Sequence, residues 1–162
     1  SDLEIAVPEL EKRGLGAAFF IPAGKIGGKG FLSEKGLEEM VASGMRIGSH
    51  GWSHRSWRSL DSSARRQEFE ESKQRLEQVI QHPVDLAACP FGDYDRSVLR
   101  CLQSAGYRAV YTSDRGVATS GQFLQPRNTI HANDGDDDAL KERRGFQDSL
   151  KRTLRLAVKR WR

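Results

Sequence analysis

Short runs of apolar and β-forming residues alternate along the chain with longer stretches in which apolar residues recur at helical spacing. A short continuous apolar run is typical of a strand that is buried on both faces. Strands are predicted at residues 17–21, 45–48, 84–89, 107–111 and 129–130. Because helical segments separate these runs, the pattern predicts a parallel sheet with helices outside it.

The helices between these strands are marked by their caps and by their apolar stripes. The first is predicted over 2–13, with Pro8 near its start, and the second begins at Ser33 and ends at Gly44. The longest runs from Asp61 or Ser62 to about His82, and its apolar stripe contains Ala64, Phe69, Leu76, Val79 and Ile80. Two more are predicted from Asp95 to Gly106 and over 139–161.

Either an open doubly wound sheet or a barrel satisfies this alternation. In both architectures, ligands bind at the carboxyl ends of the strands. The polar residues that directly follow strands therefore need the closest attention. They are found at 49–50, 90–92 and 112–114.

The length and composition indicate one folded domain. The chain has 162 residues, of which 37% are hydrophobic and 30% charged, and this is ordinary for a globular protein. No apolar run is long enough to cross a bilayer, and no signal peptide is visible. Cys89 and Cys101 lack metal-site spacing and are predicted to be buried thiols, so the compartment stays open.

The charge divides the chain into two parts. Residues 141–162 contain nine Lys or Arg and two acids, whereas residues 1–140 carry 17 basic and 20 acidic side chains. We therefore predict a folded domain at 1–138 and a basic amphipathic helix at 139–162. A nucleic-acid-binding protein usually has its basic patch on the folded body, which argues against nucleic acid. The helix fits either docking on the domain or weak contact with an anionic membrane surface.

Two histidines follow the strand predicted at 45–48. His50 and His54 are four residues apart, a spacing that can place both imidazoles on one side of a helical turn. Neutral imidazole is a preferred ligand of zinc, and a catalytic zinc site keeps one position for water. The sequence therefore predicts a zinc site that includes His50 and His54.

The same segment carries a family resemblance. The run Gly48-Ser49-His50-Gly51-Trp52-Ser53-His54 resembles the second motif of the polysaccharide deacetylase (NodB-homology) family, carbohydrate esterase family 4. The run Pro90-Phe91-Gly92-Asp93-Tyr94 resembles the third motif. This resemblance implies a distorted (β/α) barrel in which His50 and His54 bind zinc. It also implies that Pro90, Phe91 and Tyr94 form a wall of the substrate groove and that the Phe91 N–H contributes to an oxyanion site.

The chain departs from the family pattern at three places. The first motif, T-F-D-D-G, supplies a base and a third metal ligand and is not present; we expect it just before Ser1. Ala88 stands where the third motif often has an arginine. The closing L-x-H motif, which supplies a general acid, matches only Thr129-Ile130-His131 and makes His131 the candidate.

The resemblance implies a metal-dependent hydrolase that removes acetyl groups from a polysaccharide. Two alternatives stay open: a catalytically inactive carbohydrate-binding relative, and an adaptor that acts through residues 141–162. Trp52 and Trp57 flank His54 and could stack on a sugar ring or pack in the core. Asp114 follows a strand and could contact metal or substrate, or only form a turn.

Overall fold

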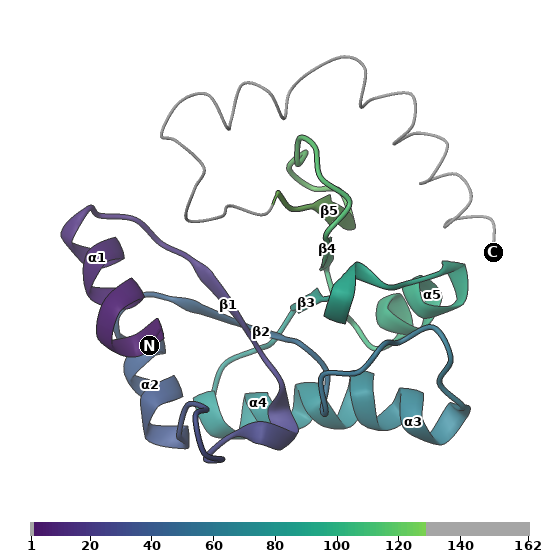
Figure 1. Cartoon of the computed structure of the whole chain (residues 1–162), viewed down its shortest axis with the longest axis horizontal. Helices are drawn as coiled ribbons and strands as arrows, with labels where there is room; N and C mark the ends of the chain where they lie inside the picture. Colours follow the sequence, from purple (N-terminus) through teal and green to yellow (C-terminus); the bar gives the residue numbers. More distant parts are fainter. Residues whose placement is uncertain (1, 129–162) are drawn as a thin grey trace.

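The computed structural model describes residues 2–128, which form a five-stranded sheet with helices arranged in an arc around it (Figure 1). The strand order is β1-β2-β3-β4-β5, and every pair is parallel. The strands are β1 (Ala18–Ile21), β2 (Arg46–Ser49), β3 (Leu86–Ala88), β4 (Ala109–Thr112) and β5 (Leu124–Pro126). The predicted α/β architecture is confirmed.

The strand order also decides between the two architectures that the sequence left open. A doubly wound sheet reverses its strand order at a switch point, whereas a (β/α) barrel adds each strand beside the previous one. The order here is sequential, which is that of the barrel type. Within residues 2–128 the sheet is not closed, and β1 and β5 are its two edges.

The helices begin where the sequence has polar caps. The side chains of Ser33, Asp61 and Asp95 accept hydrogen bonds from the backbones of α2, α3 and α5, as predicted. The α-helices are α1 (Val7–Lys12), α2 (Glu34–Ala42), α3 (Ser62–Arg66), α4 (Ser72–Ile80) and α5 (Arg96–Ser104). The helices α2 and α4 pack against each other and against β2. No helix among residues 2–128 is long and apolar enough to span a membrane.

Two predicted helices contain a wider turn. The first helix starts as the π-helix η1 (Asp2–Ala6) and continues as α1, with Pro8 in its first turn. The long predicted helix is α3, the π-helix η3 (Gln67–Glu71) and α4 in succession. Single π-turns inside helices occur often at functional sites because they redirect side chains.

One strand was missed. The sequence pattern predicts no strand between residues 111 and 129, but Leu124–Pro126 forms β5 beside β4. A three-residue strand that ends in proline carries little sequence signal, and proline is tolerated there because β5 is an edge strand. The strand predicted at 129–130 and the helix predicted at 139–162 lie outside the described residues.

The core lies between the sheet and the helices, and it settles the role of Trp57. This side chain is fully buried, with its ring edge-on to Phe69 at a centroid distance of 5.1 Å. Trp57 is therefore part of the core and offers no face to a sugar. Cys89 is buried and Cys101 half-buried, and both are free thiols.

Candidate metal and substrate site

The segment after β2, residues 49–55, is named here the histidine loop. It is held beside the end of β1, since the His50 N–H donates to the Ile21 carbonyl at 2.9 Å. The Ala23 N–H donates to the Gly51 carbonyl at 2.8 Å. These bonds fix the start of the loop at the carboxyl edge of the sheet, where ligand sites of this architecture lie.

His50 has one ring nitrogen occupied and one available. Its Nδ1 lies 2.7 Å from the Ala88 carbonyl oxygen. A carbonyl only accepts, so Nδ1 carries the proton and Nε2 keeps its lone pair. Burial lowers the pKa of His50, the Ala88 bond raises it, and the charges of His54 and Arg127 lower it further. The net lowering keeps the imidazole neutral near pH 7, as metal binding requires.

His54 comes close to His50, but not through a helical turn. Residues 50–54 form a loop in which Gly51 and His54 have φ angles of 79° and 61°. The two imidazole centroids are 4.7 Å apart. The two imidazoles are close, as expected, but they are brought together by two residues with left-handed backbone conformation. A right-handed helical turn contains no such residues.

The segment after β3, residues 89–94, is named here the Phe91 loop. It contains the 3-10 turn η4 (Pro90–Gly92), and Phe91 adopts φ 57°. The Phe91 side chain is 71% exposed, and its ring stands edge-on to His54 at a centroid distance of 4.9 Å. In this turn, the Gly92 N–H donates to the Cys89 carbonyl and the Asp93 N–H donates to the Pro90 carbonyl. The Phe91 N–H takes no part in these turn bonds.

The remaining predicted residues of the Phe91 loop are inside the protein. Pro90 and Tyr94 are buried. The Tyr94 hydroxyl donates to Asp114 Oδ2 at 2.7 Å, so Tyr94 positions Asp114 and presents no ring face to a ligand. Asp114 follows β4 and is partly exposed. The Asp93 carboxylate accepts from Ser56 Oγ and ties this loop to the segment after the histidine loop.

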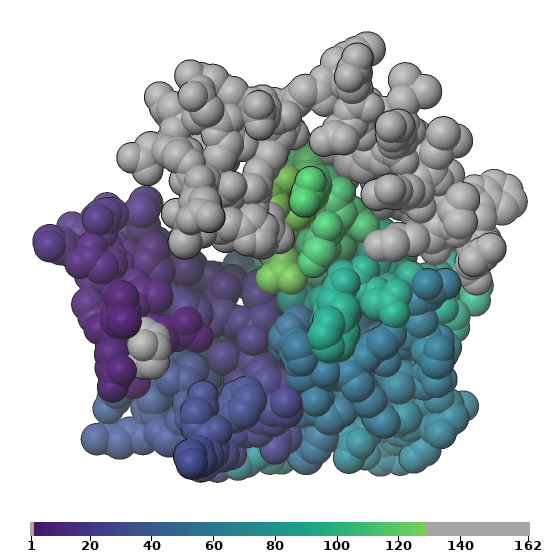
Figure 2. Space-filling model, in the orientation of Figure 1, coloured from purple at the N-terminus to yellow at the C-terminus, as the bar shows by residue number. Residues whose placement is uncertain are grey.

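A cavity of about 810 Å³ opens beside the histidines. His50 and His54 contribute to its wall together with Phe20, Pro22 and Phe31. Trp52 is half-buried, with its indole against the Gly24 backbone. Figure 2 shows the first segments of the chain (purple) on one side of this face and later segments (steel blue to teal) on the other. The residues that line this cavity all come from the part of the chain before residue 55.

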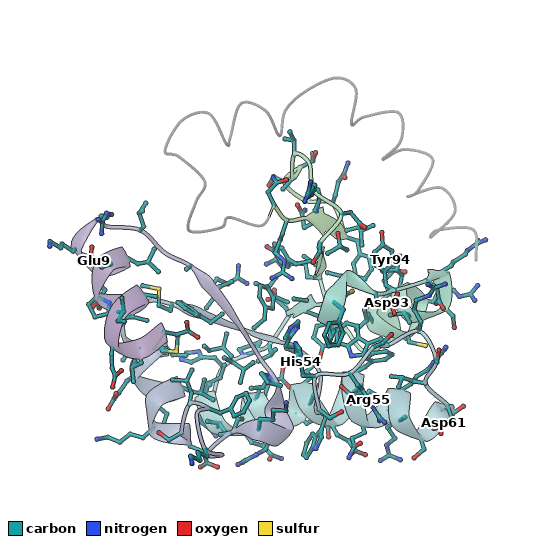
Figure 3. All side chains as sticks on the ribbon, in the orientation of Figure 1. Glu9, His54, Arg55, Asp61, Asp93 and Tyr94 are labelled. Atoms are coloured by element: carbon teal, nitrogen blue, oxygen red, sulfur yellow. The ribbon has the colours of Figure 1, made fainter. Side chains whose placement is uncertain are left out.

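A buried carboxylate that the sequence analysis missed supports the histidine loop. Glu68 in η3 accepts hydrogen bonds from the backbone N–H of Trp52 at 2.7 Å and that of Ser53 at 3.2 Å. Figure 3 shows the neighbouring Arg55 beside His54, directed towards the helices below. A signal was present in the sequence. Glu68 and Ser72 stand at four-residue spacing in line with Leu76 and Ile80, so two polar residues interrupt an apolar face.

The described residues contain no complete set of metal ligands. Two imidazole nitrogens suit zinc, which takes three protein ligands in catalytic sites. Within residues 2–128, no group of three His, Cys, Asp or Glu side chains could hold a metal ion. His131, the predicted general acid, lies outside the described residues, so its role stays a prediction.

Known proteins share this sequence pattern and this fold. The family model described as polysaccharide deacetylase matches residues 3–110. The putative polysaccharide deacetylase YxkH of Bacillus subtilis is 26% identical over 130 residues, which cover 80% of this chain and 47% of YxkH. The chain thus spans about half the length of this curated relative.

Two solved structures share the fold at low identity. Streptococcus pyogenes deacetylase PplD, in complex with acetate, gives a TM-score of 0.81 at 22% identity over 89% of this chain and 65% of PplD. BA3943 of Bacillus anthracis, a CE4 family pseudoenzyme, gives 0.60 at 18% identity over 67% of this chain and 37% of BA3943. With its family model matched over two thirds of its length, the chain belongs to the polysaccharide deacetylase family.

Proposed function

We propose that this chain provides the histidine ligands and the substrate wall of a zinc-dependent deacetylase that acts on an acetylated polysaccharide. The observation that carries the proposal is the hydrogen bond from His50 Nδ1 to the Ala88 carbonyl. Such a bond orients a ligating imidazole and leaves Nε2 for the metal. His54, at a centroid distance of 4.7 Å, is near enough to share the same ion.

The third ligand and the base are proposed to be carboxylates outside the described residues. The family's first motif would provide both, at positions before Ser1 in a longer protein. Without a base beside the metal to take a proton from the attacking water, hydrolysis is expected to be roughly 10²–10⁴-fold slower. Residues 2–128 alone are therefore expected to bind zinc weakly and to have little activity.

The chemistry follows from how this chain's groups surround the ion. Bound zinc would supply Lewis-acid catalysis at the acetyl carbonyl. The Phe91 N–H, unused in its own turn, would donate to the oxygen on which negative charge develops. His131 is proposed to protonate the departing sugar nitrogen or oxygen. Acetate and a deacetylated sugar would be released.

The substrate class is supported by the exposed wall of the site. The Phe91 ring is 71% exposed beside His54, and aromatic faces pack well against the apolar faces of sugar rings. Trp52 and Asp114 are half-buried nearby and would provide a second contact surface and a polar group. The acetate held by PplD fits acetyl removal in a protein of this fold.

The alternative is an inactive relative that keeps the groove and has lost the chemistry. Ala88 in place of the expected arginine favours it, and a pseudoenzyme of the same fold exists. The alternative predicts glycan binding without acetate release at any zinc concentration. An active deacetylase predicts zinc-dependent acetate release once the upstream carboxylates are present.

The first test is zinc binding by calorimetry. The metal-free chain is compared with a His50→Ala/His54→Ala variant and with His82→Ala, a control at an exposed histidine. We expect saturable binding in the chain and the control, and none in the double variant. Equal binding in all three would overturn the metal site. Acetate release from acetylated chito-oligosaccharides is then measured in the natural full-length protein, with and without zinc.

A further inference from the structure

We propose that Glu68 is the positioning residue of the histidine loop, fixing the backbone conformation that turns His54 towards His50. This inference deepens the proposed function and rests on His50 and His54 being metal ligands. Glu68 has no exposed side-chain surface and lies on the helix beneath the loop. The residues that donate to its carboxylate all come from 52–55.

The contacts require a carboxylate at this position. The N–H groups of Trp52 and Ser53, the Ser53 hydroxyl and the Arg55 Nε all donate to Glu68. A carboxylate only accepts, so every contact is satisfied, whereas the NH₂ group of glutamine would oppose at least one donor. Arg55, at 3.1 Å and 46% exposed, compensates the buried charge from the solvent side.

Ser72, the first residue of α4, holds the start of the loop. Ser72 Oγ donates to the Glu68 carbonyl and lies 3.0 Å from Ser49 Oγ. Ser49 Oγ accepts from the Gly51 N–H at 3.1 Å. The loop therefore has two anchors, Ser72 beside His50 and Glu68 at residues 52–55, on both sides of His54.

The second anchor acts on His54 through the backbone. His54 has a φ of 61°, a conformation that non-glycine residues hold only when the surroundings impose it. The bonds from Trp52, Ser53 and Arg55 to one carboxylate fix the residues on both sides of His54. Gly51 completes the arrangement, because a side chain there would collide with the Glu68 carboxylate.

The test compares Glu68→Gln with a control variant on the same helix. Glu70→Gln makes the same charge change at an exposed position of η3. Zinc affinity is measured by calorimetry, and exchange of the Trp52 and Ser53 amide protons by NMR.

We expect Glu68→Gln to weaken zinc binding about 10–100-fold, as loss of a group that orients ligands does. The Trp52 and Ser53 amides should also lose their exchange protection in this variant and keep it in Glu70→Gln. The proposal is overturned if Glu68→Gln binds zinc as Glu70→Gln does and its two amides stay protected.

Two further outcomes are decided by other measurements. If the parent chain binds no zinc, the proposed function loses its support, and amide exchange alone then decides whether Glu68 orders the loop. If Glu68→Gln does not fold, Ser53→Ala replaces it, since Ser53 is exposed and donates to the same carboxylate. Weaker zinc binding in Ser53→Ala than in the exposed control Ser59→Ala supports the proposal, and equal binding overturns it.

Discussion

The histidine loop and the Phe91 loop follow neighbouring strands and meet at one site, but different forces hold them. The histidine loop is anchored by the buried carboxylate of Glu68 and by the Ser49–Ser72 contact. The Phe91 loop has turn bonds of its own, is tied to Ser56 and Asp114 through side-chain contacts of Asp93 and Tyr94, and leaves its central ring 71% exposed. The difference suits the proposed division of labour. Ligands of one ion need fixed geometry, whereas a wall for a sugar needs exposed surface.

The largest expected effect is on the buried aromatic residue behind the histidine loop. Trp57→Ala should lower the free energy of unfolding by about 3–5 kcal/mol, because it removes a fully buried ring that contacts Phe69. Denaturant unfolding monitored by circular dichroism measures the change. Phe91→Ala, the matched change at an exposed ring, should stay within about 0.5 kcal/mol. Equal losses would show that the Phe91 ring contributes as much to stability as the buried Trp57 ring.

The next effect tests how tightly the Phe91 loop is folded against Ser113, the residue that follows β4. Gly92 has a φ of 65°, and a side chain there would lie 2.8 Å from the Cβ of Ser113. Gly92→Ala should cost about 1–3 kcal/mol of unfolding free energy, combining backbone strain with this clash. Gly14 has a similar φ of 64°, but a Cβ there would meet no other atom. Gly14→Ala therefore measures the cost of the backbone strain alone. If Gly92→Ala lowers the free energy of unfolding no more than Gly14→Ala does, Ser113 moves away and relieves the clash.

A smaller change separates substrate positioning from metal binding. Tyr94→Phe removes the hydroxyl that donates to Asp114 and should cost about 0.5–1.5 kcal/mol of unfolding free energy. Zinc affinity should be unchanged, because Tyr94 belongs to the Phe91 loop. Calorimetry with zinc and denaturant unfolding give the two values. Weaker zinc binding in Tyr94→Phe would show that the two loops act as one unit.

The smallest effect concerns pH. The folded-state pKa of His50 is below the ordinary 6.5, first because of burial, and the unfolded chain therefore binds more protons below that pH. The stability contributed by neutral His50 is complete above 6.5 and is lost as the pH falls through the lowered pKa. The metal-free chain should lose more stability than His50→Gln between about pH 7.5 and about pH 5.5. Identical losses in denaturant unfolding would contradict this assignment.

Much of the fold was predictable because its signals are local. Apolar runs predicted four of the five strands, and Ser33, Asp61 and Asp95 marked helix starts through short-range caps. The fifth strand at Leu124–Pro126 has no comparable signal, since it forms only by pairing with β4. The histidines were found from their position after a strand, and the structure places them together at the sheet edge.

The sequence by itself determined the alternation of strands and helices, the family, and the residue types at the candidate metal site. These depend on short-range patterns that survive without knowledge of long-range contacts. Only the tertiary structure decided that Trp57 is core, that Tyr94 supports Asp114, and that the histidine loop rests on Glu68. Each of these involves partners at least twelve residues apart, and whether a side chain there is buried or exposed depends on which other elements cover it.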